Sequence, residues 1–264
     1  MTSSLVGSEM CIRDRYKDLR KGTNMEIKEF SELMNLYGKE ISIEFSDIQV
    51  EKFYKYMNLL IEWNEKMNLT AITEPKEIIV KHFIDSLTIL KDIKGKNTLV
   101  DVGTGAGFPG IPLKIMNEEI KITLLDSLNK RINFLNEVIN QLDLKNIETI
   151  HSRVEEAGKN KKYRESFDIA TARAVANLST LSEYMLPLVK TGGKSICMKG
   201  SEVSEEIQNS KKAISILGGK IENIENFELP KSDMMRNIVI IKKVKTTPNK
   251  YPRKPGTPSK EPIN

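Results

Sequence analysis

The residues best suited to chemistry form one short run, Asp101-Val-Gly-Thr-Gly-Ala-Gly-Phe-Pro-Gly110. An apolar stretch ends in an acid, and glycines then occupy alternate positions from 103 to 107. Glycine destabilises strands and helices, so several together indicate positive φ angles or close approach of another molecule to the backbone. The run predicts a strand that enters a ligand-binding turn, followed by a helix. A tight turn without a ligand is the alternative.

A second acid, Asp126, ends the next predicted strand and follows Gly107 by 19 positions (126 − 107). In open parallel sheets, ligands bind beyond the carboxyl ends of the strands. A carboxylate at this place can accept hydrogen bonds from both hydroxyls of a ribose. The two positions together indicate a cofactor that contains adenosine.

Two cofactors of that kind compete for the turn around Gly103 and Gly105. One is a dinucleotide, because residues 105–110 match the GxGxxG pattern, although a lone match is weak evidence. The other is S-adenosylmethionine, whose methionine ammonium group Asp101 could hold. Pro109 and Pro112 favour the second cofactor, because they remove N–H donors that a pyrophosphate would need at the start of the helix. A methyltransferase is therefore favoured over an NAD(P)-dependent oxidoreductase.

The composition excludes several classes of protein. Two cysteines in 264 residues, Cys11 and Cys197, exclude a disulfide framework and agree with a reducing cytosol. No apolar run reaches about eighteen residues, so we expect no membrane span and a cytoplasmic protein. The two histidines and two cysteines are scattered, so we expect no metal site. We also expect a monomer.

The positive charge is concentrated near the end of the chain. Residues 242–264 hold seven lysines and arginines against one glutamate, a net +6, which leaves −1 for the rest of a chain whose total is +5. Five prolines between positions 246 and 262 predict an extended segment without a core pattern. Such a tail indicates an anionic polymer as partner, and a solvated tail is an equally good alternative.

The chain divides into four parts. Residues 1–24 show no sustained period and no apolar segment of a signal peptide, so we expect an artefactual leader, with the true start at Met25. Residues 25–95 predict a helical cap, in which Ser46 or Asp47 caps the second helix and Pro75 starts the third. Residues 96–245 predict the catalytic domain, and residues 246–264 the basic tail.

Residues 96–245 alternate between strands and helices, which predicts an α/β fold with a mostly parallel sheet covered on both faces. The last strand follows its predecessor by a short link and can run antiparallel. The expected strands are 98–102, 121–126, 147–151, 167–172, 193–198, one near 221–227, and 237–242. The expected helices are 109–116, 128–142, 177–189 and 202–217.

From about Met25 onward the chain resembles the bacterial glucose-inhibited division protein B family, which methylates guanine N7 in 16S ribosomal RNA of the small subunit. The residues that carry the resemblance are 63–71, 81–87, 101–110, 125–135, 152–156, 171–176 and 251–258. The resemblance implies a class I S-adenosylmethionine-dependent methyltransferase fold, with a Rossmann-like seven-stranded sheet. It also implies S-adenosylmethionine as cofactor and, as partner, 16S rRNA within the small subunit or an assembly intermediate.

The resemblance also implies roles for particular residues. Gly103 and Phe108 match the cofactor-binding loop, Val154 and Glu155 match the pair that brackets the adenine, and Arg173 matches the catalytic arginine beside the methyl donor. The residues expected to face RNA are Lys130, Arg131, Arg153 and Lys199.

Several of these residues also have purely structural interpretations. Phe108 could serve ordinary helix–sheet packing, and Glu155 could be a solvated carboxylate or a helix cap. His82 lies on the apolar helical cap and is better explained as a hydrogen-bonding structural histidine than as an acid or base. Trp63 fits a helical apolar stripe, and Cys197 lies in a buried strand and is expected to be inert.

The atom that accepts the methyl group decides which catalytic residues a methyltransferase needs. The loop that commonly serves amine methylation is absent after the fourth strand, where Thr171-Ala-Arg-Ala-Val-Ala176 stands instead. Methylation of cytosine carbon needs a thiolate in the cleft, and Cys197 is poorly placed for it. Guanine N7 has a free lone pair and needs no base, which fits this chain. The alternatives are a methyltransferase of another RNA site, a protein or a small molecule, and a ribosome-binding factor without activity.

Overall fold

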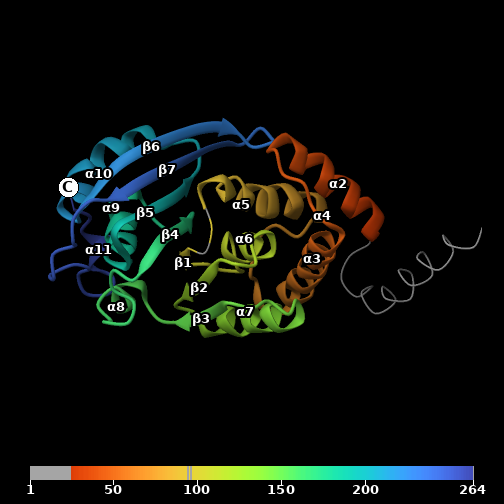
Figure 1. Cartoon of the computed structure of the whole chain (residues 1–264), viewed down its shortest axis with the longest axis horizontal. Coiled ribbons are helices and arrows are strands. Elements are labelled where there is room, and N and C mark those ends of the chain that lie inside the picture. Colours follow the sequence, from red (N-terminus) through yellow and green to blue (C-terminus); the bar gives the residue numbers. More distant parts are fainter. Residues whose placement is uncertain (1–24, 94, 96, 264) are drawn as a thin grey trace, which may run out of the picture.

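A seven-stranded sheet forms the centre of the computed structural model, which describes residues 25–93, 95 and 97–263 (Figure 1). The leader expected at residues 1–24, with Cys11, lies outside the described residues. The strand order is β3-β2-β1-β4-β5-β7-β6. The strands are β1 (Thr98–Val102), β2 (Lys121–Asp126), β3 (Ile147–His151), β4 (Phe167–Arg173), β5 (Val189–Lys199), β6 (Gly219–Glu228) and β7 (Met235–Lys243).

The strands run parallel from β1 to β5, whereas β7 is antiparallel to both β5 and β6. This arrangement confirms the α/β class, the mostly parallel sheet and the expected final hairpin. The helices after β1 are α6 (Gly110–Met116), α7 (Asn129–Gln141), α8 (Val154–Ala157), α9 (Leu178–Met185), η4 (Leu186–Leu188), α10 (Ser204–Ile216) and α11 (Thr257–Lys260). None of the described helices combines the length and the apolar character that crossing a membrane requires.

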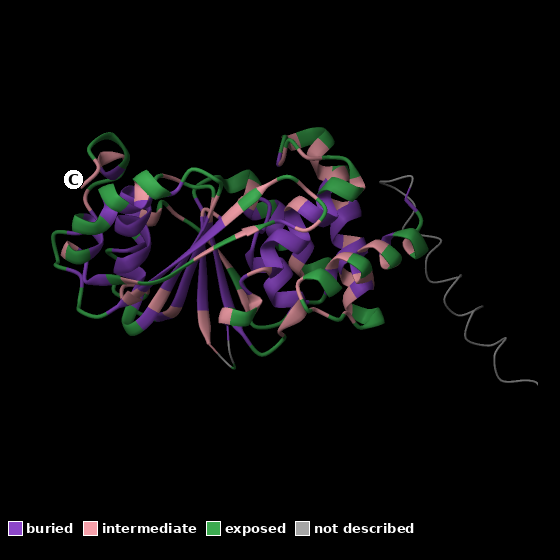
Figure 2. Cartoon of the chain, turned by 90° about the horizontal axis from the view of Figure 1, so that it is seen from above, coloured by how far each residue is buried: buried purple, intermediate pink, exposed green. Residues whose placement is uncertain are grey.

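Helices cover both faces of the sheet, so its central strands are buried between two layers (Figure 2). Side chains along β1 alternate between the layers, as a pleated strand dictates. Leu99 joins the core under α6 and α7, whereas Val100 and Val102 join the core under α9 and α10. The two layers cover the faces of the sheet and leave the edge at the carboxyl ends of its parallel strands available for a ligand site.

The N-terminal helices pack onto the outside of the α6–α7 layer (Figure 1). They begin with α2 (Ile27–Glu40) and α3 (Asp47–Met67). Ser46 caps α3: its hydroxyl accepts the Gln49 N–H at 3.3 Å, and the Gln49 side chain accepts the Ser46 N–H at 2.9 Å. The aromatic ring of Phe83 contacts both Phe53 on α3 and Phe108 in the glycine turn. Cap and sheet therefore share one apolar core.

The third helix of the cap departs from its expected form. Pro75 does start it, but it is divided into α4 (Pro75–Ile78), the π-helical turn η2 (Ile79–Ile84), α5 (Asp85–Leu87) and the 3₁₀ turn η3 (Leu90–Asp92). A guanidinium N–H of Arg173 donates to the Lys81 carbonyl at 3.0 Å. A side chain inserted into a helical hydrogen-bond ladder is one of the known causes of such irregularity. The π turn accordingly marks where the cap meets the sheet.

The C-terminal segment, expected to be extended and without a core pattern, has little regular secondary structure but packs onto the rest of the fold. Thr247 and Tyr251 are buried, and the short helix α11 lies within this segment. Lys243, one of the seven basic residues of 242–264, has no exposed surface and forms an ion pair with Glu165 at 3.1 Å. Burial lowers the pKa of Lys243 to about 8. Part of the basic charge is therefore neutralised inside the fold.

Candidate active site

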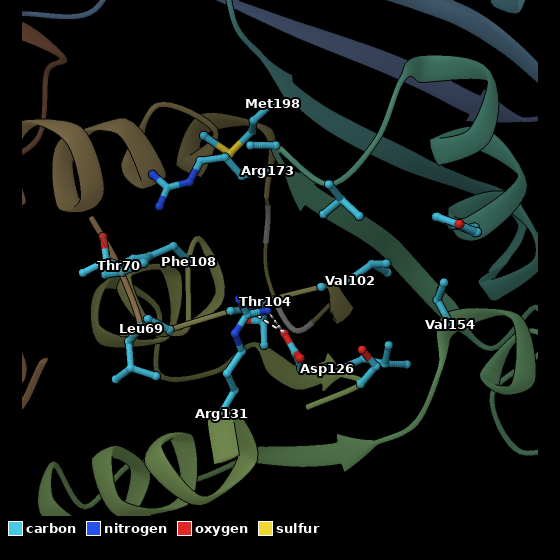
Figure 3. A pocket seen from close by; sticks show the side chains of 18 of the residues that line it. Leu69, Thr70, Val102, Thr104, Phe108, Asp126, Arg131, Val154, Arg173 and Met198 are labelled. Atoms are coloured by element: carbon cyan, nitrogen blue, oxygen red, sulfur yellow. Dashed lines mark hydrogen bonds and ion pairs between the residues drawn. The ribbon is translucent and has the colours of Figure 1, made fainter. Parts of the chain in front are cut away.

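A cavity of about 760 Å³ opens at the carboxyl ends of the central strands. It lies where β1 and β4 are neighbours and the strand order changes direction, which is the usual ligand site of such sheets. Its wall includes the glycine turn, the ends of β2, β4 and β5, the cap helix and the C-terminal segment. Figure 3 shows Arg173 and Met198 on one side of the cavity, with Asp126 and Arg131 across from them.

The glycine turn presents bare backbone to this cavity. Gly103, Gly105 and Gly107 have φ angles of 65°, 62° and 102°, so the expected positive φ is confirmed. The Gly103 N–H donates to the Leu125 carbonyl at 2.8 Å, and the Gly105 N–H donates to the Asp126 carboxylate at 3.0 Å. A Cβ placed on Gly105 would have no neighbour closer than 4.0 Å, so this side of the turn faces open space. A ligand can therefore lie directly against it.

Gly107 is needed for packing, and Gly107→Ala is expected to destabilise the fold by about 2–4 kcal/mol, from overpacking and backbone strain together. A Cβ there would lie 2.5 Å from Ile111 Cδ1 and 2.7 Å from the Tyr56 hydroxyl. Gly105→Ala is the matched control, because it adds the same atom toward open space and should cost only about 1 kcal/mol of strain. Urea unfolding of both variants measures the difference, and equal losses would contradict it.

Asp101 lies beneath the turn and not on the cavity wall. Its side chain has no exposed surface, and its Oδ2 accepts the Thr104 hydroxyl at 2.7 Å and the Gly110 N–H at 2.8 Å. Its Oδ1 is buried without a hydrogen-bond partner. Burial raises the pKa of Asp101 to about 6. In the structure, this acid holds the turn to the start of α6 through its Oδ2. The expected contact between Asp101 and a methionine ammonium stays a prediction.

The raised pKa of Asp101 predicts a pH-dependent stability that Asp101→Asn removes. The folded state holds this proton more tightly than the unfolded state, so the free energy of unfolding should fall as the pH rises from about 4 to about 6. The loss should amount to about 2–3 kcal/mol relative to the asparagine variant. Urea unfolding at several pH values between 4 and 7 measures it. Parallel profiles for the two proteins would contradict this assignment.

The start of α6 has no free N–H group at its first three positions. The Gly110 N–H is bound by Asp101, the Ile111 N–H donates to the Gly107 carbonyl at 2.8 Å, and Pro112 has no N–H. Binding of a pyrophosphate at a helix N-terminus depends on such free donors. The structure therefore argues against the dinucleotide alternative, in agreement with the two prolines.

Asp126 links the turn to the neighbouring strand. Its Oδ2 accepts the Gly105 N–H and an N–H of Arg131 at 3.2 Å, and its Oδ1 accepts the Leu128 N–H at 2.9 Å. A carboxylate has about four acceptor positions, so three are in use. Arg131, which we expect to face RNA, pairs with this acid on the cavity wall.

A buried carboxylate joins two arginines at the other side of the cavity. Asp85 accepts Arg173 Nη1 through Oδ2 and Arg236 Nε through Oδ1, each at 2.9 Å. The Asp85 side chain is 3% exposed, and those of Arg173 and Arg236 are 15% and 16% exposed. The three residues come from α5, β4 and β7, so one ion cluster fixes the cap against two strands. All three line the cavity.

Phe108 forms an aromatic platform next to this cluster. The His82 ring stacks on it with centroids 4.4 Å apart, and the Arg173 guanidinium lies 5.0 Å from its centre. His82 contacts the Thr70 hydroxyl at 2.9 Å through one nitrogen and Arg173 at 3.2 Å through the other. Burial lowers the pKa of His82 to about 3, so the ring is neutral at ordinary pH. His82 is thus a hydrogen-bonded histidine, as expected, but it also lines the cavity.

The other residues expected to face RNA lie in different settings. Lys199 is bound to the Ala176 carbonyl at 2.8 Å and to Glu206 at 2.7 Å, and its side chain is only 10% exposed. Lys130 is exposed and does not line the cavity. Its ammonium group donates to the Met67 carbonyl at 3.2 Å. Arg153 is exposed and lines the cavity. Of the four, only Arg153 combines exposure with a place on the cavity rim.

Val154 and Glu155 begin α8 and line the cavity beside Asp126. Glu155 is 4% exposed, and its Oε1 accepts the N–H of Gly256 from the C-terminal segment at 2.8 Å. The solvated-carboxylate interpretation of Glu155 is therefore wrong. Trp63 is partly buried against Phe134, with ring centroids 5.6 Å apart.

Cys197 is fully buried in the core under α9 and α10, and burial raises the pKa of its thiol to about 12. It is 4.0 Å from the Met185 sulfur and does not line the cavity. A thiol in this state supplies no nucleophile.

Three parts of the site were not predicted: Asp85, Arg236, and Gly256 with Ser259 from the C-terminal segment. Asp85 lies within the matched run 81–87, and an acid on an apolar helix is the only local signal for it. Arg236 is 151 residues away from Asp85 and carries no local signal at all.

Comparison with known proteins gives consistent matches. A family model described as GidB, rRNA small subunit methyltransferase G, matches residues 49–238. The ribosomal RNA small subunit methyltransferase G of Acetivibrio thermocellus is 60% identical over 222 residues, which cover 84% of this chain and 91% of the relative. Its counterpart in Clostridium botulinum (strain Eklund 17B) is 56% identical over 236 residues, covering 89% and 99%. A Pyrococcus horikoshii protein described as a transferase shares the fold, with a TM-score of 0.50 and 12% identity over 78% of this chain and 66% of that one.

Proposed function

Because the chain belongs to the GidB family, rRNA small subunit methyltransferase G, we propose that its cavity binds S-adenosylmethionine and directs the methyl group to N7 of a guanine in 16S rRNA. The observation that carries the proposal is the bare glycine turn at the switch point of the sheet. It opens into a cavity that an arginine, Arg173, enters from β4.

The turn and its surroundings fit this cofactor. The open side of Gly105 accommodates a ligand against the backbone, and the occupied helix start offers nothing to a pyrophosphate. Asp126 has about one acceptor position left. Accepting both hydroxyls of a ribose would therefore require Arg131 to leave it. When bound, the cofactor supplies a methyl group on a positively charged sulfur.

The ionisable side chains of the cavity fit an acceptor that needs no deprotonation. Both oxygens of Asp85 and both oxygens of Asp126 already accept protein hydrogen bonds. Both nitrogens of His82 are engaged as well. These hydrogen bonds hold the three side chains in place and favour a positioning role over that of a base. The chain's contribution is then to orient the acceptor, which is the main requirement of an in-line displacement.

The RNA contacts belong on the cap side and the rim of the cavity. Arg153 is exposed on the rim, and Arg173 and Arg236 retain guanidinium N–H groups on the cavity wall. Arginine N–H groups match phosphate oxygens and the guanine O6 acceptor. We expect binding to weaken with rising salt, because phosphate contacts release counterions.

Methylation of small ribosomal subunits tests the proposal. Subunits from a bacterial strain that lacks its own copy of this gene are incubated with the protein and methyl-labelled S-adenosylmethionine. The rRNA is then digested and analysed by mass spectrometry. We expect label in a single 7-methylguanosine, and none when the subunits come from the parent strain, where the position is already modified. Label in protein, or in another nucleotide, would refute the assignment.

A further inference from the structure

The C-terminal segment returns to the cavity and closes one of its ends. Residues 246–263 follow β7, pass α8 and end against α9, where the Ser179 hydroxyl donates to the Ile263 carbonyl at 2.6 Å. In Figure 1 this segment and α11 lie beside α8 and α9, away from the cap helices. Gly256 and Ser259 from this segment line the cavity, next to Val154 and Glu155.

The segment is held by a buried ion pair. Glu183 on α9 is 1% exposed, and its carboxylate accepts the backbone N–H of Arg253 at 2.7 Å, the Arg253 Nε at 3.0 Å and the Arg253 Nη2 at 2.7 Å. Bidentate pairs of this type fix geometry as well as adding energy. The Thr180 hydroxyl adds a bond to the Pro258 carbonyl at 2.9 Å. The turn between these anchors, residues 253–259, is therefore fixed at both ends.

Residues 253–259 also hold the Glu155 side chain in place. Gly256 has a φ of 83°, which directs its N–H to the Glu155 Oε1 at 2.8 Å. The Ser259 hydroxyl donates to the Gly256 carbonyl at 3.1 Å and also interacts with Tyr184, another residue of the cavity wall. A carboxylate as buried as Glu155 needs such a partner, because an unpaired buried charge is costly.

We propose that residues 253–259 are part of the cofactor site: they form the wall at its adenosine end and position Glu155. The inference rests on the proposed function, because it assigns this end of the cavity to the adenosine of S-adenosylmethionine. Gly256 and Ser259 are positioning residues, which act through Glu155 and through the shape of the wall. The exposed lysines of the segment, Lys250 and Lys254, point to RNA as the other role to be tested.

Calorimetric titration with S-adenosylmethionine tests the inference when it is applied to valine variants of two glycines. Gly256 and Gly192 have φ angles of 83° and 90°, and a Cβ on either would meet nothing within 4 Å. Gly192 lies at an exposed position of β5 that does not line the cavity. Both Gly→Val variants should therefore suffer similar backbone strain. We expect Gly256→Val to weaken cofactor binding about tenfold or more, as for loss of a hydrogen bond to a charged group, and Gly192→Val to leave it unchanged.

A second pair of variants keeps the test decisive if Gly256→Val does not fold. Ser259→Trp fills the cavity wall, whereas Lys260→Trp adds the same side chain at the adjacent exposed position, which is off the wall. We expect only Ser259→Trp to lose cofactor affinity. Unchanged affinity in both Gly256→Val and Ser259→Trp would overturn the inference, and so would a loss confined to binding of small ribosomal subunits. If the unmodified protein bound no S-adenosylmethionine, the proposed function itself would fail.

Discussion

Replacing Arg173 with alanine is expected to lower kcat/KM for rRNA methylation by about 100-fold or more. The guanidinium reaches the cavity from the end of β4 and lies 5.0 Å from the centre of the Phe108 ring, with Asp85 fixing its direction. Loss of a group that orients the acceptor acts on turnover, because a displacement of this type depends on alignment. We expect the fold to persist, since Asp85 keeps its second arginine. Single-turnover methylation and circular dichroism measure the two effects.

Arg236→Ala is the control that separates the effect of Arg173 on orienting the acceptor from its effect on fold stability. It removes the other partner of Asp85, at the same 2.9 Å and with nearly the same side-chain exposure. Arg173 also donates to the Lys81 carbonyl and contacts His82, so Arg173→Ala should lose somewhat more stability than Arg236→Ala, and it should lose far more turnover. Near wild-type turnover of Arg173→Ala would contradict the catalytic role. Equal turnover losses in both variants would show that the ion cluster, and not Arg173 itself, is what matters.

Asp85→Ala is expected to destabilise the fold by about 2–4 kcal/mol, because it leaves two adjacent guanidinium groups without their shared carboxylate. The lower part of this range reflects the partial exposure of both arginines, which lets water and salt screen their repulsion. Loss of the carboxylate also releases Arg173 from its fixed direction, so turnover should fall as well. Urea unfolding and single-turnover assays measure the two quantities.

Asp143→Ala is the matched control for this substitution. Asp143 also pairs with a cation, Lys145, but both side chains are largely exposed, at 81% and 75%. Exposed pairs contribute little, so we expect no measurable change in stability or turnover. A loss for Asp85→Ala no larger than that of the control would show that the cluster does not hold the cap to the sheet.

The features that the sequence predicted are those with local causes. The strands of the sheet follow from short apolar runs, and the glycine turn follows from the positive φ that Gly103, Gly105 and Gly107 all adopt. The capping of α3 by Ser46 follows from the side chain three residues later, Gln49. In each case the residues that determine the structure lie within a few positions of one another.

The features that it missed have causes far away in the chain. Asp85 meets Arg236 across 151 positions, and Glu155 meets Gly256 across 101. The π turn arises beside Arg173, 92 positions beyond the Lys81 carbonyl that it binds. Only tertiary structure determines which partner such a polar group takes.

The single apolar core shared by the cap and the sheet has a consequence for biosynthesis. Phe30 and Phe53 have no exposed surface, and they are packed with residues as distant as Phe108 and Phe134. The ribosome makes the cap first, so its aromatic side chains emerge before the layer that will cover them exists. Exposed apolar surface of this kind is prone to aggregation. The nascent cap must therefore stay protected at least until the α6–α7 layer has left the exit tunnel, and the sheet beneath that layer is complete only when β7 has followed.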